Sequence, residues 1–358
     1  MPAALLLGYD LEQPSYRHRM RSIVEPLTVA GWQVRMERLP SGRYGVRTWE
    51  RRELLRAADV TVLHQIKLSG LEARLVAALS RHRVFDLDDA IYVRKPRRLG
   101  EPAGESMWRR RKFAATCRWV DCVAAGNEVL ACAARPSAPE TLILPTSIDA
   151  AVYAAKGAAH AAMGAPHVAA GAAVAGARAA AMSHPAPTIV WIGSPENLVY
   201  LEMIRPALTR LTMRHPGLTL RVICSKFPDW PAVNIERIAW SSATEAESLA
   251  CAHIGVMPLT DDEWARGKCA FKLLQYMAAS LPCVASPIGA NTEAVVDGVT
   301  GFHARNDAEW ERALNRLIES PTLRDRMGTA GHAHVVARYA IRTYQARYVA
   351  LLERLAAR

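Results

Sequence analysis

Short apolar segments alternate along most of the chain with longer segments in which apolar residues recur every three or four positions. The short segments have the length of strands, as at residues 4–8, 59–64 and 83–86. The segments between them, such as residues 15–30 and 69–81, have the length of helices. Regular alternation of strands and helices predicts a parallel sheet with helices on both of its faces.

An alanine-rich segment interrupts this alternation once. Alanine occupies 18 of the 32 positions from 150 to 181, glycine recurs, and no acidic residue is present. Alanine favours helix, but few large apolar side chains remain to be buried, so we expect a partly helical or disordered linker; a packed helix is the alternative. The alternation then resumes, which predicts four parts: a first domain at 1–149, the linker at 150–186, a second domain at 187–335, and a helix at 336–358 that is a candidate for packing back on the first domain.

Composition agrees with two globular domains. The chain has 358 residues, of which 51% are hydrophobic and 22% charged, and this excludes a wholly disordered protein. No apolar run has the length of a membrane-spanning helix, and the start, MPAALLLGYD, predicts a strand and not a signal peptide. Seven cysteines without a Cys-x-x-Cys pair predict buried thiols in a reducing compartment, with neither zinc nor disulfides. The net charge of +11 favours anionic partners.

Basic residues gather at the start of the helix predicted over residues 269–280. Arg266 and Lys268 precede it, and Lys272 lies in its first turn. The free N–H groups and partial positive charge of a helix N-terminus suit a phosphate, so these three cations together suit a diphosphate. Gln275 lies three positions after Lys272 on the same side of the helix, where it suits a ribose hydroxyl. A solvated basic helix start is the alternative.

Two turns that follow predicted strands are candidates for close approach of a ligand to the backbone. Gly193 and Ser194 end the strand at 188–193, and a glycine there leaves room for a ligand. The corresponding turn after the strand at 282–286 contains Gly289, Ala290 and Asn291. Ordinary strand-to-helix turns are the alternative for both.

In the first domain, the motif FDLDDA at residues 85–90 places three carboxylates at the end of a strand. Clustered carboxylates repel one another and need a cation, a proton or a hydrogen-bonding ligand, and sugar hydroxyls are such a ligand. We therefore predict that Asp88 and Asp89 contact substrate, with a structural ion-pair network as the alternative. Further candidates on the acceptor side, each with an ordinary structural role as the alternative, are Arg17, Arg19, His64 and Asn127.

The stretch Arg94–Lys112 holds eight basic and two acidic residues, together with Met107 and Trp108. Such a stretch is usually a solvated face, but it also suits an anionic membrane, at roughly 1 kcal/mol for each basic residue near the surface. Peripheral membrane contact through this stretch is therefore a hypothesis, and it would suit a lipid-linked substrate.

The run KLLQYMAASLPCVASPIGANTEAVVDGVTGF at residues 272–302 resembles the donor-binding region of glycosyltransferase family 4, because helix, strand, turn and next helix match in order. The segments LPTSID (144–149), WIGSPENLVYLE (191–202) and PSYRHRM (14–20) resemble other parts of that family. The resemblance covers most of the chain outside the alanine-rich segment. It implies the GT-B fold, in which two Rossmann-like α/β domains face each other across a cleft.

The resemblance also implies a function. A retaining enzyme of this kind moves a sugar from a nucleotide sugar to a hydroxyl acceptor, here a glycan or lipid-linked glycan, without an obligatory metal or other cofactor. Cationic side chains and a helix end stabilise the leaving diphosphate. We therefore expect a cytoplasmic enzyme, with the inner face of the membrane as the alternative location.

Two departures from the family pattern concern the donor site. The family's paired glutamates correspond here to Gly267 and Gln275; the amide can still hydrogen-bond a ribose, whereas the glycine leaves the donor sugar without its usual carboxylate. Candidates to replace that carboxylate are Asp261, Asp262 and Glu263. The usual Arg and Lys are also missing from GSPENLVYLE, so the resemblance assigns the diphosphate to the three cations near residue 270.

Two other functions remain open. FDLDDA also resembles the first motif of haloacid-dehalogenase-like phosphatases, in which Asp86 would attack phosphate, although that motif usually opens the fold and here lies 85 residues into the chain. The substitutions at Gly267 and Gln275 leave room for a non-catalytic sugar-nucleotide binder. The basic surplus also suits nucleic acid, but no nucleic-acid-binding motif accompanies it.

Overall fold

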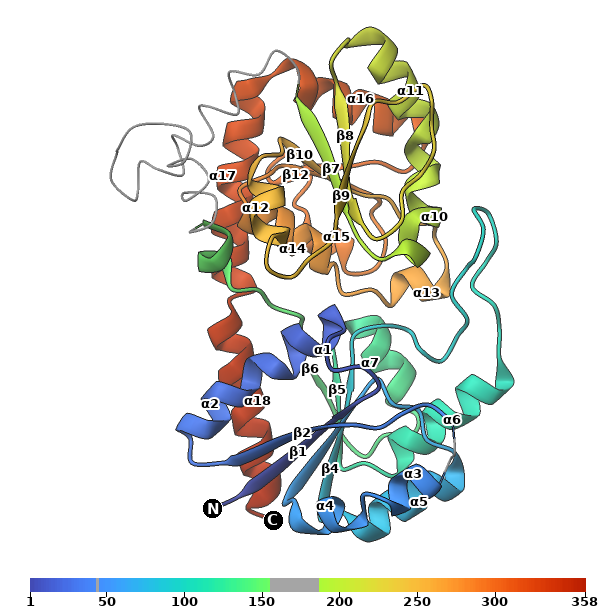
Figure 1. The fold of residues 1–358 in the computed structure, drawn as a ribbon, viewed down its shortest axis with the longest axis vertical. Coiled ribbons are helices and arrows are strands. Elements are labelled where there is room, and N and C mark those ends of the chain that lie inside the picture. The colour runs from blue at the N-terminus through green and yellow to red at the C-terminus, as the bar shows by residue number, and fades with distance from the viewer. Residues whose placement is uncertain (43–44, 155–186) are drawn as a thin grey trace.

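The computed structural model describes residues 1–42, 45–154 and 187–358, which form two α/β domains, one above the other in Figure 1. Each domain contains a six-stranded parallel sheet, in the order β2-β1-β3-β4-β5-β6 in the first and β12-β11-β10-β7-β8-β9 in the second. The predicted class, two Rossmann-like α/β domains, is therefore confirmed. The predicted linker falls mostly on residues 155–186, which lie outside the described residues.

The first sheet consists of β1 (Ala3–Gly8), β2 (Gln33–Arg38), β3 (Val60–His64), β4 (His82–Leu87), β5 (Cys122–Ala125) and β6 (Thr141–Ile143). Its helices are α1 (Pro14–Arg19), α2 (Val24–Val29), α3 (Val46–Trp49), α4 (Arg52–Ala57), α5 (Gly70–Leu79), α6 (Met107–Arg118) and α7 (Glu128–Ala134). Every residue of β3 is buried, as expected for a central strand of β-branched and apolar residues with helices on both sides.

The second sheet consists of β7 (Thr188–Ile192), β8 (Thr219–Cys224), β9 (Ile235–Ala239), β10 (Ile254–Met257), β11 (Cys283–Ala285) and β12 (Gly301–His303). Its helices are α10 (Leu198–Leu201), α11 (Arg205–Arg214), α12 (Glu245–Ala250), α13 (Glu263–Arg266), α14 (Phe271–Ala278), α15 (Asn291–Ala294), α16 (Asp307–Glu319) and α17 (Pro321–Arg338). None of the helices among the described residues is long and apolar enough to cross a membrane.

Two segments of helical length are each broken in the structure, and the first of them, residues 15–30, was predicted as a single helix. The segment 15–30 divides into α1, a 3-10 turn at Arg21–Ile23 and α2, and the segment after residue 197 divides in the same way into α10, a 3-10 turn at Glu202–Ile204 and α11. Pro26 and Pro206 follow the two 3-10 turns. Proline lacks the N–H that would bond back one turn, so each break occurs where the helical ladder loses a donor.

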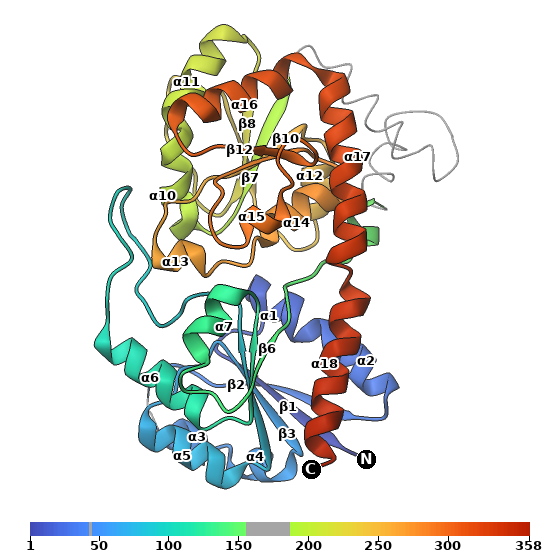
Figure 2. The same ribbon diagram turned by 180° about the vertical axis from the view of Figure 1, so that it is seen from behind.

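The last helix, α18 (Ile341–Ala356), leaves the second domain and lies beside the first (Figure 2). Its apolar side chains join the core formed by β1 and β3. The Tyr344 hydroxyl donates to the Arg19 carbonyl at 2.9 Å, and the Tyr348 hydroxyl lies 3.3 Å from Asp86. The chain therefore crosses between the domains a second time and connects them on one side.

The carboxyl ends of the strands in both domains meet at the cleft. Asp88 follows β4 and Gly193 follows β7, and both line one cavity between the domains. One apolar cluster continues across the contact, with Ala90 on one side and Ala265 on the other. Open parallel sheets bind their ligands at such strand ends, so this cavity is the candidate functional site.

Candidate functional site

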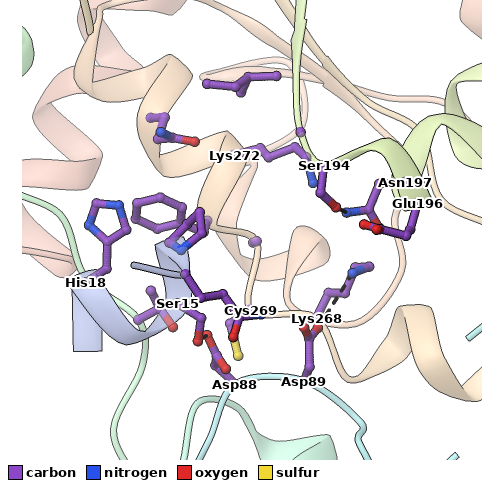
Figure 3. A pocket seen from close by; sticks show the side chains of 18 of the residues that line it. Ser15, His18, Asp88, Asp89, Ser194, Glu196, Asn197, Lys268, Cys269 and Lys272 are labelled. Carbon is purple, nitrogen blue, oxygen red and sulfur yellow. Dashed lines mark hydrogen bonds and ion pairs between the residues drawn. The ribbon is translucent and has the colours of Figure 1, made fainter. Parts of the chain in front are cut away.

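The cavity has a volume of about 430 Å³ and receives side chains from both domains (Figure 3). The predicted residues that line it are Asp88, Asp89, Gly193, Ser194, Lys268, Lys272 and Gln275. They come from the end of β4, the end of β7 and the start of α14, so residues nearly 200 positions apart in the sequence meet here.

Lys272 lies in the first turn of α14 and reaches the cavity past the end of β7. A Cβ atom on Gly193 would lie 2.9 Å from Lys272 Cε and 2.7 Å from the Trp191 ring. Glycine at 193 therefore leaves room for the Trp191 ring and the lysine chain beside the end of the strand. Burial and the nearby positive charge of Lys268 together lower the pKa of Lys272 to about 7, while Asp89 opposes the shift. A bound anion would favour the charged ammonium at this position.

Lys268 and the carboxylates after β4 face each other across the cavity, as Figure 3 shows. Lys268 Nζ lies 3.5 Å from Asp89 Oδ1, and the lysine is 9% exposed. Burial raises the pKa of Asp89, and the charge of Lys268 counteracts this shift. The cavity therefore places two cations on the second domain opposite two carboxyl groups on the first.

Behind these carboxylates, Arg19 and His64 surround a fully buried Asp86. Arg19 Nε and Nη2 lie 2.8 and 2.7 Å from the two carboxylate oxygens, and His64 Nδ1 lies 2.8 Å from Oδ1. Burial opposes ionisation of Asp86, but the arginine and the histidine outweigh it and lower the pKa to about 2. Neither Arg19 nor His64 lines the cavity, because both are occupied in this network.

The buried network reaches the cavity through one hydroxyl. Ser15 Oγ lies 2.8 Å from His64 Nε2 and 2.5 Å from Asp88 Oδ2. Gln65 Nε2 also donates to Asp88. His64, predicted on the acceptor side, therefore acts through Ser15 to fix the orientation of Asp88.

Four other predicted residues lie near the cavity but outside its lining. Arg266 is exposed, and its Nε lies 2.6 Å from Asp261 Oδ1. Gly289 has φ 54°, and a Cβ there would lie 2.4 Å from the Arg266 carbonyl oxygen, so the turn of Gly289, Ala290 and Asn291 packs on that backbone. Asn291 Nδ2 donates to the Ser286 carbonyl at 3.1 Å. The turn thus supports the loop before α14.

Arg17 and Asn127, the remaining acceptor-side candidates, have different surroundings. The Arg17 guanidinium lies 5.8 Å from the centre of the Trp240 ring. Asn127 caps α7, accepting from Leu130 N–H, and its Nδ2 donates to the carbonyls of Gly267 and Lys268 at 3.0 and 3.1 Å. Asn127 therefore joins the first domain to the loop that carries Lys268.

The missing carboxylate at Gly267 has a steric explanation. A Cβ at this position would lie 2.6 Å from the Ala90 Cβ in the other domain. A glutamate would therefore collide with the first domain in this arrangement. The three candidate replacements make other contacts: Asp261 pairs with Arg266, Asp262 caps α13, and Glu263 pairs with Arg110.

Sequence reasoning missed several residues of the lining, namely Ser15, His18, Lys95, Glu196, Trp240 and Glu245. Ser15 and His18 lie within PSYRHRM, so that motif did contain a signal. The His18 ring lies 4.1 Å from the Phe271 ring, and burial lowers its pKa to about 3, so it stays neutral. Glu245 lies in an unremarkable helical segment, and only the tertiary structure places it in the cavity.

The described residues contain no group of three His, Cys, Asp or Glu side chains that could hold a metal ion. The ionic character of the cavity comes from lysines and from carboxyl groups, of which Asp89 pairs with Lys268 and Glu196 with Lys95. The arrangement is suited to binding an anion on the second domain and hydroxyl groups on the first.

The second domain is similar in sequence to a known family. Residues 186–320 match the family model described as Glycosyl transferases group 1. None of the curated proteins matches the chain in sequence.

Solved structures match the fold of nearly the whole chain. Sucrose-phosphate synthase from Thermosynechococcus elongatus is 13% identical with a TM-score of 0.74, and 100% of each chain is covered. HepE from Anabaena in complex with UDP and glucose is 14% identical with a TM-score of 0.67, covering 99% of this chain and 100% of HepE. A glycosyltransferase from Rickettsia africae is 10% identical with a TM-score of 0.69, covering 99% and 98%.

At such low identity these structures establish the fold, and the family model adds a sequence similarity over residues 186–320. The predicted resemblance to glycosyltransferases of GT-B fold is confirmed. This chain has the GT-B fold, and residues 186–320 of its C-terminal domain are similar to the glycosyl transferases group 1.

Proposed function

We propose that this protein is a retaining glycosyltransferase, similar to family 4, that moves a sugar from a nucleoside-diphosphate sugar to an acceptor hydroxyl. One observation carries the proposal: Lys268 and Lys272, at the start of α14, face Asp88 and Asp89 across the interdomain cavity. The match of the second domain to glycosyl transferases group 1 supports it. So does HepE, a structural neighbour that was solved with UDP and glucose.

The cations supply the electrostatic part of the reaction. When the bond between the sugar and the diphosphate breaks, negative charge grows on the leaving phosphate. The Lys272 ammonium and the first N–H groups of α14 lie where they would stabilise that charge, in a site partly shielded from water. Because these groups are held in place before the reaction, little reorganisation is needed. No metal or other cofactor is required in this proposal.

The carboxylates supply the contacts to hydroxyl groups. Asp88 is oriented by Ser15 and Gln65, and Asp89 is held opposite Lys268. A carboxylate accepts hydrogen bonds from sugar hydroxyls, and one fixed in orientation selects which hydroxyl approaches the donor. In this proposal Asp88 and Asp89 therefore bind the hydroxyl that receives the sugar.

The proposal is tested by donor binding followed by donor turnover. A thermal-shift screen against UDP-, GDP- and ADP-sugars should show one class that raises the melting temperature, because only the folded cavity binds it. The same donor should then release its nucleoside diphosphate slowly in water and faster with an acceptor. Lys272→Arg, which keeps the charge, should retain more activity than Lys272→Met. Stabilisation by no sugar nucleotide, together with no nucleotide release, would reject the proposal.

The two other functions lose support in the structure. Asp86 is fully buried, and both of its carboxylate oxygens are occupied by Arg19, so no phosphate ester reaches it for a phosphatase reaction. A non-catalytic sugar-nucleotide binder would bind the donor in the same screen without releasing nucleotide. A nucleic-acid binder would show steeply salt-dependent binding to any duplex, without binding a sugar nucleotide.

We also propose that the acceptor is reached at an anionic membrane from the cytoplasmic side. Residues 94–104 form a loop that projects alongside α13 (Figure 1), and α6 follows it. Two residues of the basic stretch form ion pairs within the protein: Lys95 lies 3.9 Å from Glu196, and Arg110 lies 2.6 Å from Glu263. The exposed basic and apolar side chains that remain, called the loop surface here, are Arg97, Arg98, Leu99, Met107, Trp108 and Arg111; Arg94, Glu101 and Glu105 are exposed beside them.

The loop surface combines cations with exposed apolar side chains. Met107 is 68% exposed and Trp108 58% exposed, beside the exposed Arg111 on α6. Such a mixture suits the interface of an anionic bilayer. The protein should sediment with vesicles containing phosphatidylglycerol, and Arg97→Glu with Arg98→Glu should abolish this. The matched reversal Arg342→Glu on α18 should not. Equal sedimentation of both variants would reject the membrane proposal.

A further inference from the structure

A short chain of hydrogen bonds joins α14 to α12 in the wall of the cavity. Gln275 Nε2 lies 3.1 Å from the Tyr153 hydroxyl oxygen, and that oxygen lies 3.3 Å from Glu245 Oε1. Trp240 Nε1 donates to Glu245 Oε2 at 3.0 Å. Gln275 is 4% exposed and Glu245 6% exposed, and both line the cavity.

The hydrogen bonds in this chain run in one direction. Burial and the charge of Glu245 raise the pKa of Tyr153, so its hydroxyl keeps its proton and donates it to the carboxylate. The same oxygen must then accept from Gln275, which therefore turns Nε2–H toward Tyr153. With its amide fixed in this way, Gln275 offers its Oε1 as an acceptor.

This wall of the cavity consequently offers acceptors and no side-chain donors from Gln275 or Glu245. An ionised carboxylate has about four acceptor positions on its two oxygens, and Tyr153 and Trp240 are among the groups that donate to Glu245. A ligand that matches two neighbouring acceptors must bring two neighbouring donors. A vicinal diol does so, and Gln275 lies one helical turn beyond Lys272, next to the place proposed for the diphosphate.

We propose that Glu245 is the charged acceptor for the ribose of the donor, and that Glu245 and Gln275 together bind its vicinal hydroxyls. This inference rests on the proposed function, because a nucleoside diphosphate must occupy the cavity. It assigns to α12 a specificity-determining carboxylate that sequence motifs do not indicate. A nucleotide with the full ribose diol would be favoured over one lacking a hydroxyl.

The inference also explains why residue 275 is an amide. A glutamate at this position would place a second carboxylate next to the Tyr153 hydroxyl, which already contacts Glu245. Tyr153 has a single proton to donate, so one of the two carboxylates would face a lone pair, and the two like charges would repel. The series of hydrogen bonds through Tyr153 is complete with one carboxylate and one amide, whereas two carboxylates would leave one of them without a donor.

The experiment measures nucleotide affinity by calorimetry. The nucleoside diphosphate that binds best among UDP, GDP and ADP is compared with its 2′-deoxy and 3′-deoxy forms. The wild-type protein should prefer the ribose form by about tenfold or more, as expected for a hydrogen bond to a charged acceptor. Glu245→Gln, which keeps the shape, should weaken ribonucleotide binding by about tenfold and leave the affinity for the deoxy forms within about twofold.

A charge exchange gives the sharper test. Gln275→Glu alone should weaken binding of the ribose form, because it places two carboxylates around Tyr153. Adding Glu245→Gln should restore at least about half of the lost difference in binding free energy between the ribose and deoxy forms. The matched control Glu247→Gln, at an exposed position on the same helix, should behave as the wild type.

The outcomes separate this inference from the proposed function. If the wild-type protein binds no nucleoside diphosphate, both fail. If it binds one but Glu245→Gln weakens the ribose and deoxy forms equally, or changes neither, the diol assignment is overturned and the proposed function stands. The same holds if the charge-exchanged double variant is worse than both single variants.

Discussion

The two faces of the cleft hold their charged residues in opposite ways. On the second domain, Lys268 and Lys272 reach the cavity, and burial lowers the pKa of Lys272 to about 7. On the first domain, Arg19 and His64 are bound to Asp86 behind the surface, whereas Asp88, Asp89 and Lys95 reach the cavity. A basic residue near a strand end therefore lines the cavity on one face, as Lys272 does, and belongs to the protein core on the other, as Arg19 does.

The largest expected effect concerns the stability of the first domain. Replacing Arg19 with methionine leaves the Asp86 carboxylate buried without its bidentate partner, which should lower the free energy of unfolding by about 3–5 kcal/mol. Urea denaturation of the two separate variants Arg19→Met and Lys272→Met measures this. The free energy of unfolding of the lysine variant should fall by less than about 1 kcal/mol. Equal losses in the two variants would contradict the difference between the faces.

The next effect concerns turnover. Lys272→Met should lower kcat for the transfer by about 100-fold to 1,000-fold, because a positive charge aimed at the leaving phosphate is lost. The measurement is a single-turnover assay with the best donor, so that product release does not hide the chemical step. A variant that stays folded and transfers sugar at the normal rate would remove Lys272 from the mechanism.

A smaller effect concerns proton uptake. At about pH 8, an amine with a pKa near 7 is mostly neutral in the empty cavity, and a bound diphosphate raises that pKa, so binding should take up close to one proton. At about pH 6 the amine is already charged, so uptake through this group should be small. Calorimetry in buffers of different ionisation enthalpy measures it, and Lys272→Met supplies the background. Identical uptake by the two proteins at both pH values would contradict the prediction.

The smallest effect concerns a cation beside the cavity. Arg266 pairs with Asp261 at the surface, so Arg266→Ala should change donor affinity and turnover by less than about twofold. Steady-state kinetics across donor concentrations measure both quantities. A loss as large as that of Lys272→Met would show that the loop before α14 rearranges to bring Arg266 to the diphosphate.

The sequence predicted those parts of the molecule that depend on residues close together in the chain. The helix α14 and its cavity-lining Lys272 and Gln275 come from one continuous run, so their spacing alone indicated a shared face. The buried strands were predicted because they are apolar throughout. The edge strands β2 and β9 were missed, because an edge exposes alternate side chains and breaks the apolar run.

The rest of the site depends on contacts between distant residues. No local pattern shows that Arg19 is bound to Asp86, 67 positions away, or that Gly267 lies against Ala90. Glu245 reaches the cavity because α12 packs beside the segment that contains Tyr153. Sequence reasoning therefore found which residues carry charge but not which of them a substrate can reach.

The central claim is that the start of α14 binds a diphosphate inside the interdomain cavity. The most direct measurement is a crystal structure of the protein with the nucleoside diphosphate that stabilises it most. The account predicts phosphate oxygens within hydrogen-bonding distance of the ammonium groups of Lys268 and Lys272. A nucleotide bound elsewhere on the protein, or a diphosphate in the cavity that leaves both lysines uncontacted, would contradict it.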